Sequence, residues 1–168
     1  MNASLIAPQE RVSLAWEALA SVEDPEIPAV NILDLGLIRG INVRSDSVLE
    51  VGLSPTYVGC PATDVIRQSV EDALVAAGVG RFAVTTVLSP AWTSDWITAE
   101  GRIKLERYGI VPPPHSSLRD VLRAHRPVAC PRCHSTETEC VSEFGSTPCK
   151  ALHRCRACLE PFEYFKCI

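Results

Sequence analysis

The feature that most constrains this 168-residue chain is a repeated cysteine pair in its last quarter. Cys130 and Cys133 are separated by two residues, Cys155 and Cys158 repeat that spacing, and 21 residues lie between the pairs. Each C-x-x-C turn can direct two thiolates at one ion, and four thiolates complete a closed tetrahedral shell. Because about 50 residues with few large apolar groups can hardly bury a core unaided, the spacing predicts a small domain held together by a structural metal ion.

The first pair also matches the pattern of covalent haem attachment, since His134 follows Cys133. We find no secretion signal, and no apolar run reaches the roughly 20 residues that a membrane span needs. We therefore expect a cytoplasmic protein with reduced cysteines, which favours zinc over haem and leaves iron or a redox dithiol as alternatives. His134 is then expected near the surface or behind the metal ligands.

A run of three prolines ending at Pro114 separates the chain into two parts. Composition predicts a first domain over 1–108, a proline-rich linker over 109–116, and a zinc-ribbon domain with a short leading helix over 117–168. The part up to Pro114 has 14 acidic and 8 basic residues, net −6, and the rest has 6 acidic and 8 basic, net +2. Four thiolates and one divalent ion would cancel that excess, so we expect no nucleic-acid partner.

The first part alternates between helical and strand periodicity. Apolar residues at helical spacing predict helices over 9–21, from Ile66 to Gly78 and over 98–108. Two apolar runs predict an antiparallel hairpin over 35–53, and alternation predicts a strand over 82–88. The fold class is therefore α/β, with helices packed on a small mixed sheet. The apolar stripe of the first helix consists of Val12, Ala15, Trp16 and Leu19.

One cysteine of the first part, Cys60, lies in the segment "SPTYVGCPATD". Pro61 suits the first position of a helix because it lacks an N–H that would be unpaired there, and this places Cys60 at the helix cap. Free backbone N–H groups and the helix dipole favour a thiolate at that position, the form that binds soft metals. A small, buried apolar side chain is the alternative interpretation.

Two acidic residues of "DPEIP", Asp24 and Glu26, would lie at the same site as Cys60 if their loop lies beside the start of the second helix. An ordinary solvated turn is the alternative. Three further cysteines remain in the second part: Cys140, Cys149 and Cys167. Burial as small apolar residues is the plain interpretation of these three, and Cys149, in a turn between the two pairs, is the candidate for an accessible additional thiol.

Four segments that together span nearly the whole chain resemble the PaaD family of bacterial phenylacetate degradation. They are "DPEIPAVNILDLGLIRGINV", "SPTYVGCPATDVI", "LSPAWTSDWITAEGRIKLERYGIVPP" and "CPRC…SEFGSTPCKALHRCRACLEPFEYFKCI". The first domain is also similar to the wider family of iron–sulfur assembly factors that includes SufT. The resemblance implies a non-catalytic accessory role in making the multicomponent phenylacetyl-CoA epoxidase active. The implied partners are subunits of that enzyme, above all its iron–sulfur reductase or its di-iron subunit.

Carried over by position, the family's acidic motif falls on Asp24 and Glu26, and its reactive cysteine falls on Cys60. Together with the position of Cys60 at a helix start, this predicts a transient thiolate site for iron or an iron–sulfur cluster. We expect a second thiolate from another copy in a homodimer, from Cys149 or from the client. The alternative is a structural or regulatory adaptor subunit. The chain departs from the commonest ribbon form at His134 and Leu159, where glycine often follows the second cysteine, so less regular turns are expected.

Overall fold

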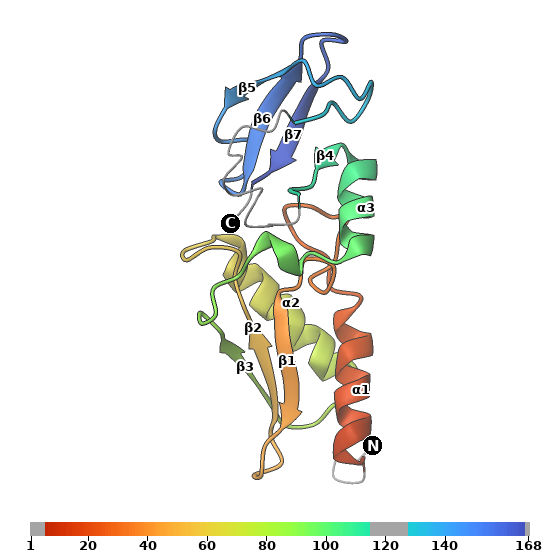
Figure 1. Cartoon of the computed structure of the whole chain (residues 1–168). Helices are drawn as coiled ribbons and strands as arrows, with labels where there is room; N and C mark the ends of the chain where they lie inside the picture. The colour runs from red at the N-terminus through yellow and green to blue at the C-terminus, as the bar shows by residue number, and fades with distance from the viewer. Residues whose placement is uncertain (1–5, 115–127, 167–168) are drawn as a thin grey trace. The chain divides into compact units, whose positions relative to one another are not determined.

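The computed structural model describes residues 6–114 and 128–166, which form two compact units divided between Trp92 and Thr93 (Figure 1). The domain boundaries derived from composition, with a linker over 109–116, stay a prediction. The short helix expected to lead the ribbon lies outside the described residues. No helix in the described part of the chain is both long and apolar enough to cross a membrane.

The first unit contains two helices and three strands. They are α1 (Pro8–Leu19), β1 (Ile38–Val43), β2 (Leu49–Leu53), α2 (Ala62–Ala76) and β3 (Phe82–Thr86). The strand order is β1-β2-β3, with β1 antiparallel and β3 parallel to the central strand. Val51 pairs with Ile41 on one side and with Val84 on the other. The predicted hairpin, helices and small mixed sheet are confirmed.

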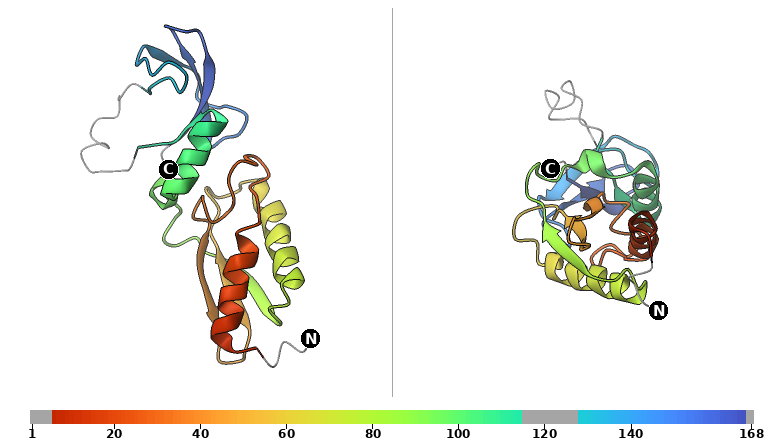
Figure 2. Two further views of the ribbon diagram at one scale, coloured as in Figure 1. Left: turned by 90° about the vertical axis from the view of Figure 1, so that its right-hand side faces the viewer. Right: turned by 90° about the horizontal axis from the view of Figure 1, so that it is seen from below.

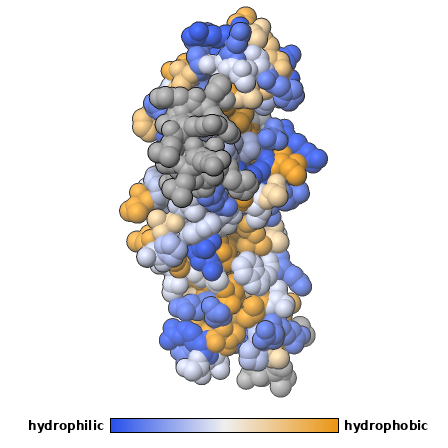
Figure 3. Space-filling model, in the orientation of Figure 1, coloured by the Kyte–Doolittle hydropathy of each residue, from blue (hydrophilic) through white to orange (hydrophobic). Residues whose placement is uncertain are grey.

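Both helices cover one face of this sheet. Helix α1 contacts β1 and α2, and α2 contacts β3; Figures 1 and 2 show α2 crossing behind the strands. The covered face buries Leu49, Val51 and Leu53 as their alternation predicted. The opposite face of the sheet is turned towards the viewer in Figure 3. Apolar residues gather there in the lower half of the view, where β1 and β2 lie in Figure 1.

Helix α1 buries a different stripe from the expected one. Its buried residues are Arg11, Ala15 and Leu19, whereas Trp16 is 38% exposed. The Arg11 guanidinium donates from Nε to the Val79 carbonyl at 2.7 Å, and its two amino groups donate to the carbonyls of Ser47 and Arg81. These bonds satisfy a buried cation with backbone oxygens, so the helix turns Arg11 inward and Trp16 outward.

The described residues of the second unit form a 3-10 turn, one helix and a four-stranded sheet. They are η2 (Ser94–Trp96), α3 (Ala99–Tyr108), β4 (Ile110–Val111), β5 (Thr138–Ser142), β6 (Lys150–Cys155) and β7 (Pro161–Phe165). The strand order is β4-β7-β6-β5. The Thr98 side chain caps α3 by accepting from the Gly101 N–H, and Gly109 ends the helix in the left-handed conformation. Strand β4 follows at once and pairs with β7.

Candidate functional site

The four paired cysteines meet at one point of the second unit. Cys130 and Cys133 lie in the turn before β5, Cys155 ends β6 and Cys158 lies before β7. All four Sγ atoms lie within 4.8 Å of one another. The Cys130–Cys158 and Cys133–Cys155 sulfur pairs are each 3.6 Å apart. A tetrahedral ion with Zn–S bonds of about 2.3 Å separates neighbouring sulfurs by about 3.8 Å, so this cluster has room for one such ion.

The two turns that present these sulfurs have matching backbone geometry. The Cys130 N–H donates to the Ser135 carbonyl, and the Cys155 N–H donates to the Glu160 carbonyl, both at 2.9 Å. His134 and Leu159 occupy the left-handed region, with φ of 61° and 62°. The expected irregularity is therefore absent from the described turns, because both residues adopt the conformation that glycine would supply, at a cost of roughly 1–2 kcal/mol each.

Backbone hydrogen bonds, burial and the neighbouring sulfurs shift the pKa values of Cys155 and Cys158 in opposite directions. A hydrogen bond from the Cys158 backbone N–H is the main cause that lowers the pKa of Cys155 to about 7. The backbone at Glu160 lowers the pKa of Cys158, but burial and hydrogen bonds with the other three cysteines together raise it, to about 12. Four thiolates so close together repel one another, and a divalent cation removes that repulsion. The donor set therefore fits a metal ion.

The cluster also takes the place of a core in the ribbon. Cys130 and Cys155 are fully buried and pack with Phe162, against which Val111 and Val128 are partly buried. His134 is exposed, as expected for a residue that is not a ligand, and its backbone N–H donates to the Cys130 carbonyl. A metal ion bound by the four sulfurs would link the two turns to each other. Through Cys130 and Cys155 it would also fix them to the small apolar cluster around Phe162.

Cys60 lies one residue farther from α2 than predicted. Helix α2 begins at Ala62 with Pro61 as its N-cap, so Cys60 precedes the cap residue instead of occupying it. Pro61 is already in the helical region, and the Cys60 carbonyl accepts from the Thr63 N–H. The Cys60 side chain is half-buried, and Gly59, at φ 86°, has no atom within 4 Å of the position where a Cβ would stand. Gly59, the residue before Cys60, therefore borders open space.

Asp24 has a structural role within its own loop. The buried Asp24 carboxylate accepts from the backbone N–H groups of Glu26 at 2.9 Å and Ile27 at 2.8 Å. It also lines a cavity of about 500 Å³ together with Ser69 and Asp72 of α2. Those two residues lie more than two turns along the helix from Cys60. Convergence of Asp24 and Glu26 on the Cys60 thiol therefore stays a prediction.

The remaining cysteines differ in exposure from what the sequence suggested. Cys149 is only 5% exposed, with its Sγ 3.0 Å from the Thr147 hydroxyl, so it is not the accessible thiol that its turn position suggested. Cys140 is exposed, and its Sγ lies 3.7 Å from a Glu143 carboxylate oxygen. Cys167 lies outside the described residues. Cys140 lies on β5, which pairs with β6 alone among the described strands.

Two models of known families match the two parts of the chain. The model described as "Iron-sulfur cluster assembly protein" matches residues 15–88, which include Cys60, Asp24 and Glu26. The model described as "PaaD zinc beta ribbon domain" matches residues 114–166, which include the four clustered cysteines. Each model therefore covers one of the two candidate sites.

Individual proteins are similar over the whole chain or over its first part. A protein of Escherichia coli strain K12, named as one of the subunits of a "Putative 1,2-phenylacetyl-CoA epoxidase", is 46% identical over 165 residues, which are 97% of this chain and 96% of that protein. "Fe-S protein maturation auxiliary factor" of Porphyromonas gingivalis is 35% identical over 52% of this chain and 83% of its own length. A solved domain from Bacillus anthracis titled "Domain of Unknown Function DUF59" has a TM-score of 0.54, is 24% identical, and covers 58% of this chain and 93% of its own. That last similarity concerns the fold alone.

Proposed function

The chain belongs to the PaaD family, and on this premise we propose that it is an accessory factor for the maturation of a phenylacetyl-CoA epoxidase. In this proposal the first unit assists assembly of an iron–sulfur cluster or a di-iron centre in the enzyme, and the ribbon binds the client. The clients are the iron–sulfur reductase or the di-iron subunit. The chain itself carries out no oxidation.

Zinc is the ion proposed for the four-cysteine site. Four thiolates leave no open position for a substrate, which is typical of structural zinc, although the same shell also binds iron. The spacing of the sulfurs and the burial of Cys130 and Cys155 support a permanent ion. Elemental analysis of protein purified without air distinguishes the two metals, and one iron per chain with no zinc would contradict this assignment.

The transfer site is proposed at Cys60, and the observation that carries it is the open turn in which that thiol lies. Iron or a cluster that is transferred must bind and then dissociate. The thiolate that holds it therefore has to be accessible, and the protein should not supply all of its ligands. Cys60 is half-buried and follows Gly59, which borders open space, whereas the four clustered cysteines can together complete the shell of one ion. A second copy of the chain or the client would supply the other thiolates, and Asp24 and Glu26 would act nearby.

Replacement of Cys60 tests the proposal directly. The Cys60→Ser variant should fold normally and yield epoxidase with at least about tenfold less iron and sulfide than wild type, if transfer needs this thiolate. Cys140→Ser is the matched control, because it removes an exposed thiol from the ribbon. Client iron and sulfide content and epoxidase turnover are the measurements. Full cluster content with Cys60→Ser would refute the transfer site.

A second candidate function is that of a structural or regulatory adaptor subunit. The observation that favours it is the E. coli relative, which is named as a subunit of the enzyme. An adaptor would remain bound to the epoxidase in a fixed ratio, and Cys60→Ser would leave client iron unchanged. Size-exclusion chromatography of the mixed proteins with and without the Cys60 thiol therefore separates a stable subunit from a factor that dissociates after transfer.

A further inference from the structure

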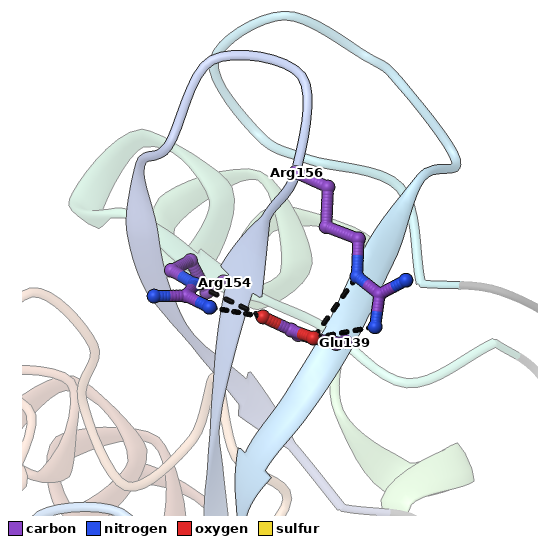
Figure 4. Close-up of polar contacts among 3 residues, drawn as sticks. All are labelled: Glu139, Arg154 and Arg156. Carbon is purple, nitrogen blue, oxygen red and sulfur yellow. Dashed lines mark hydrogen bonds and ion pairs between the residues drawn. The ribbon is translucent and has the colours of Figure 1, made fainter.

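Two arginines of the ribbon share a single carboxylate (Figure 4). Arg154 donates to Glu139 Oε1 from Nε at 3.0 Å and from Nη2 at 2.5 Å. Arg156 donates to Oε2 of the same residue from Nε at 2.9 Å and from Nη2 at 2.6 Å. Glu139 and Arg154 are direct partners across β5 and β6, so strand register sets their approach. We call these three residues the arginine fork.

The fork carries one uncompensated positive charge at the surface. Each guanidinium uses Nε and Nη2 on Glu139, which leaves the Nη1 amino group of both arginines without a carboxylate partner among the described residues. The side chains of Arg154 and Arg156 are 55% and 66% exposed. Two guanidinium groups repel each other, and Glu139 holds them together in spite of this repulsion. The fork therefore presents two fixed cations with unused donors facing solvent.

The strand that carries Glu139 is itself accessible to a neighbouring segment. β5 lies at the end of the strand order in the described part of the sheet, and its Val141 is 56% exposed. A segment passing along β5 would meet the fork first and then the apolar Val141. The register between β5 and β6 shifts between Cys140 and Ser142, so Val141 lies at an irregularity of the strand.

We propose that the arginine fork docks an acidic segment of the client protein, whose Asp or Glu carboxylates accept from the outward Nη1 groups of Arg154 and Arg156. The two outward amino groups lie on opposite sides of Glu139 (Figure 4), so each arginine would take its own carboxylate from the segment. The inference rests on the proposed function only in assigning the segment to a client. Docking at the fork and transfer at Cys60 use different residues, so either can fail without the other.

An acidic protein segment fits the fork better than a nucleic acid does. Nucleic-acid binding depends on many phosphate contacts along a basic stripe. Here Arg132 is paired with Glu160 and Lys150 with Glu163, so these nearby cations are already neutralised. Two guanidinium groups match two carboxylates in number and geometry.

Peptide binding by the full, metal-loaded chain tests the fork. The probe is a fluorescein-labelled hexaglutamate peptide, followed by anisotropy in low salt, with side-chain Nε–H signals of arginine observed by NMR. The double variant Arg154→Gln/Arg156→Gln should bind at least about tenfold more weakly, since charge-assisted hydrogen bonds are lost. Arg44→Gln/Arg132→Gln is the matched control. It removes the same charge from side chains that are 51% and 68% exposed, and it should bind like wild type.

The outcomes separate docking at the fork from general attraction. Selective shifts of the Arg154 and Arg156 Nε–H signals, with loss of binding in the fork variant alone, support the proposal. Equal weakening of both double variants overturns it, because the effect would then follow net charge. Tighter binding of a single-stranded oligonucleotide than of hexaglutamate, lost in the fork variant, overturns the choice of partner. Retained metal content in both variants shows that the ribbon is folded.

Discussion

The two regions of this molecule reach stability by different means. Of the twelve largest fully buried side chains among the described residues, nine belong to the first unit and only Phe165 comes from the stretch 128–166. The first unit is held by an apolar core under its sheet, together with the buried Arg11. The ribbon is held by four sulfurs and a few apolar neighbours. A cysteine in the first unit is therefore free to act in chemistry, whereas those of the cluster serve the fold.

The largest effect is expected from breaking the metal site. Structural zinc contributes on the order of 10 kcal/mol to the folding of small zinc domains, far more than the ribbon's apolar cluster can replace. Cys155→Ser, or removal of the ion by a strong chelator, should collapse the NMR dispersion of residues 128–166 and leave that of residues 8–86 intact. Cys60→Ser is the control and should leave both regions folded. If the NMR signals of residues 128–166 stay dispersed without metal, the ribbon does not depend on the ion, and the contrast between the two regions is wrong.

Loss of the Arg11 contacts should have the next largest effect. Arg11→Met leaves three backbone carbonyls without their donor and should lower the free energy of unfolding of the first unit by about 3 kcal/mol. Urea unfolding followed by helical circular dichroism measures the change. Arg44→Met removes an exposed ion pair with Asp46 and should cost less than about 1 kcal/mol. Equal losses would show that Arg11 is not the main polar support of this unit.

The hydrogen bonds of Asp24 predict a smaller loss. Asp24→Ala removes an acceptor for two backbone N–H groups and should cost about 1–2 kcal/mol. Asp24→Asn keeps an acceptor oxygen and should recover much of the stability, as measured in urea. If Asp24 also acts in cluster assembly, the Asn variant will be stable yet deficient in client iron. If Asp24→Ala and wild type have the same free energy of unfolding, the Asp24 carboxylate does not stabilise its loop.

The smallest effect concerns the left-handed residues of the metal turns. Leu159→Gly should relieve unfavourable backbone geometry, offset in part by a more flexible unfolded chain, with a net gain of about 0.5–1 kcal/mol. Metal competition with a chromogenic chelator should then show severalfold tighter binding. Ala157→Gly, in the same turn but without positive φ, should give weaker binding. If both glycines weaken binding, the left-handed conformation is not a significant cost to this site.

The sequence predicted those parts of the fold that depend on regular spacing. Periodicity located the helices and the hairpin, and the repeated C-x-x-C was enough to bring four sulfurs together. The stripe of α1 was right at Ala15 and Leu19, which are buried, and wrong at Trp16. Apolar spacing favoured Trp16 over Arg11, whose three acceptors come from loops distant in sequence. No local pattern reveals such acceptors. The burial of Arg11 can be explained only once the positions of the loops that carry its three acceptors are known.

The candidate sites divide along the same line. Four ligands at fixed spacing were predictable because each turn is local, and the ion only has to join two such turns. The arginine fork was missed because Glu139 and Arg154 lie far apart in sequence and meet through strand register. Cys149 is buried, as the plain interpretation of the three further cysteines predicted, but it was chosen as the candidate accessible thiol because glycine and proline nearby suggested an open turn. Its packing depends on strands β6 and β7, which a turn pattern does not report.

The position of Arg11 has a consequence for engineering the chain. Its acceptors lie before β2, at Ser47, and after α2, at Val79 and Arg81, whereas Cys60 follows β2 and precedes α2. One end of the first unit therefore has loops of fixed length, because an inserted residue would displace a carbonyl from the guanidinium. The other end, which carries Cys60, is free of that restriction. Reporter groups and cross-linkers for trapping a client belong at the Cys60 end, where added length leaves the Arg11 contacts in place.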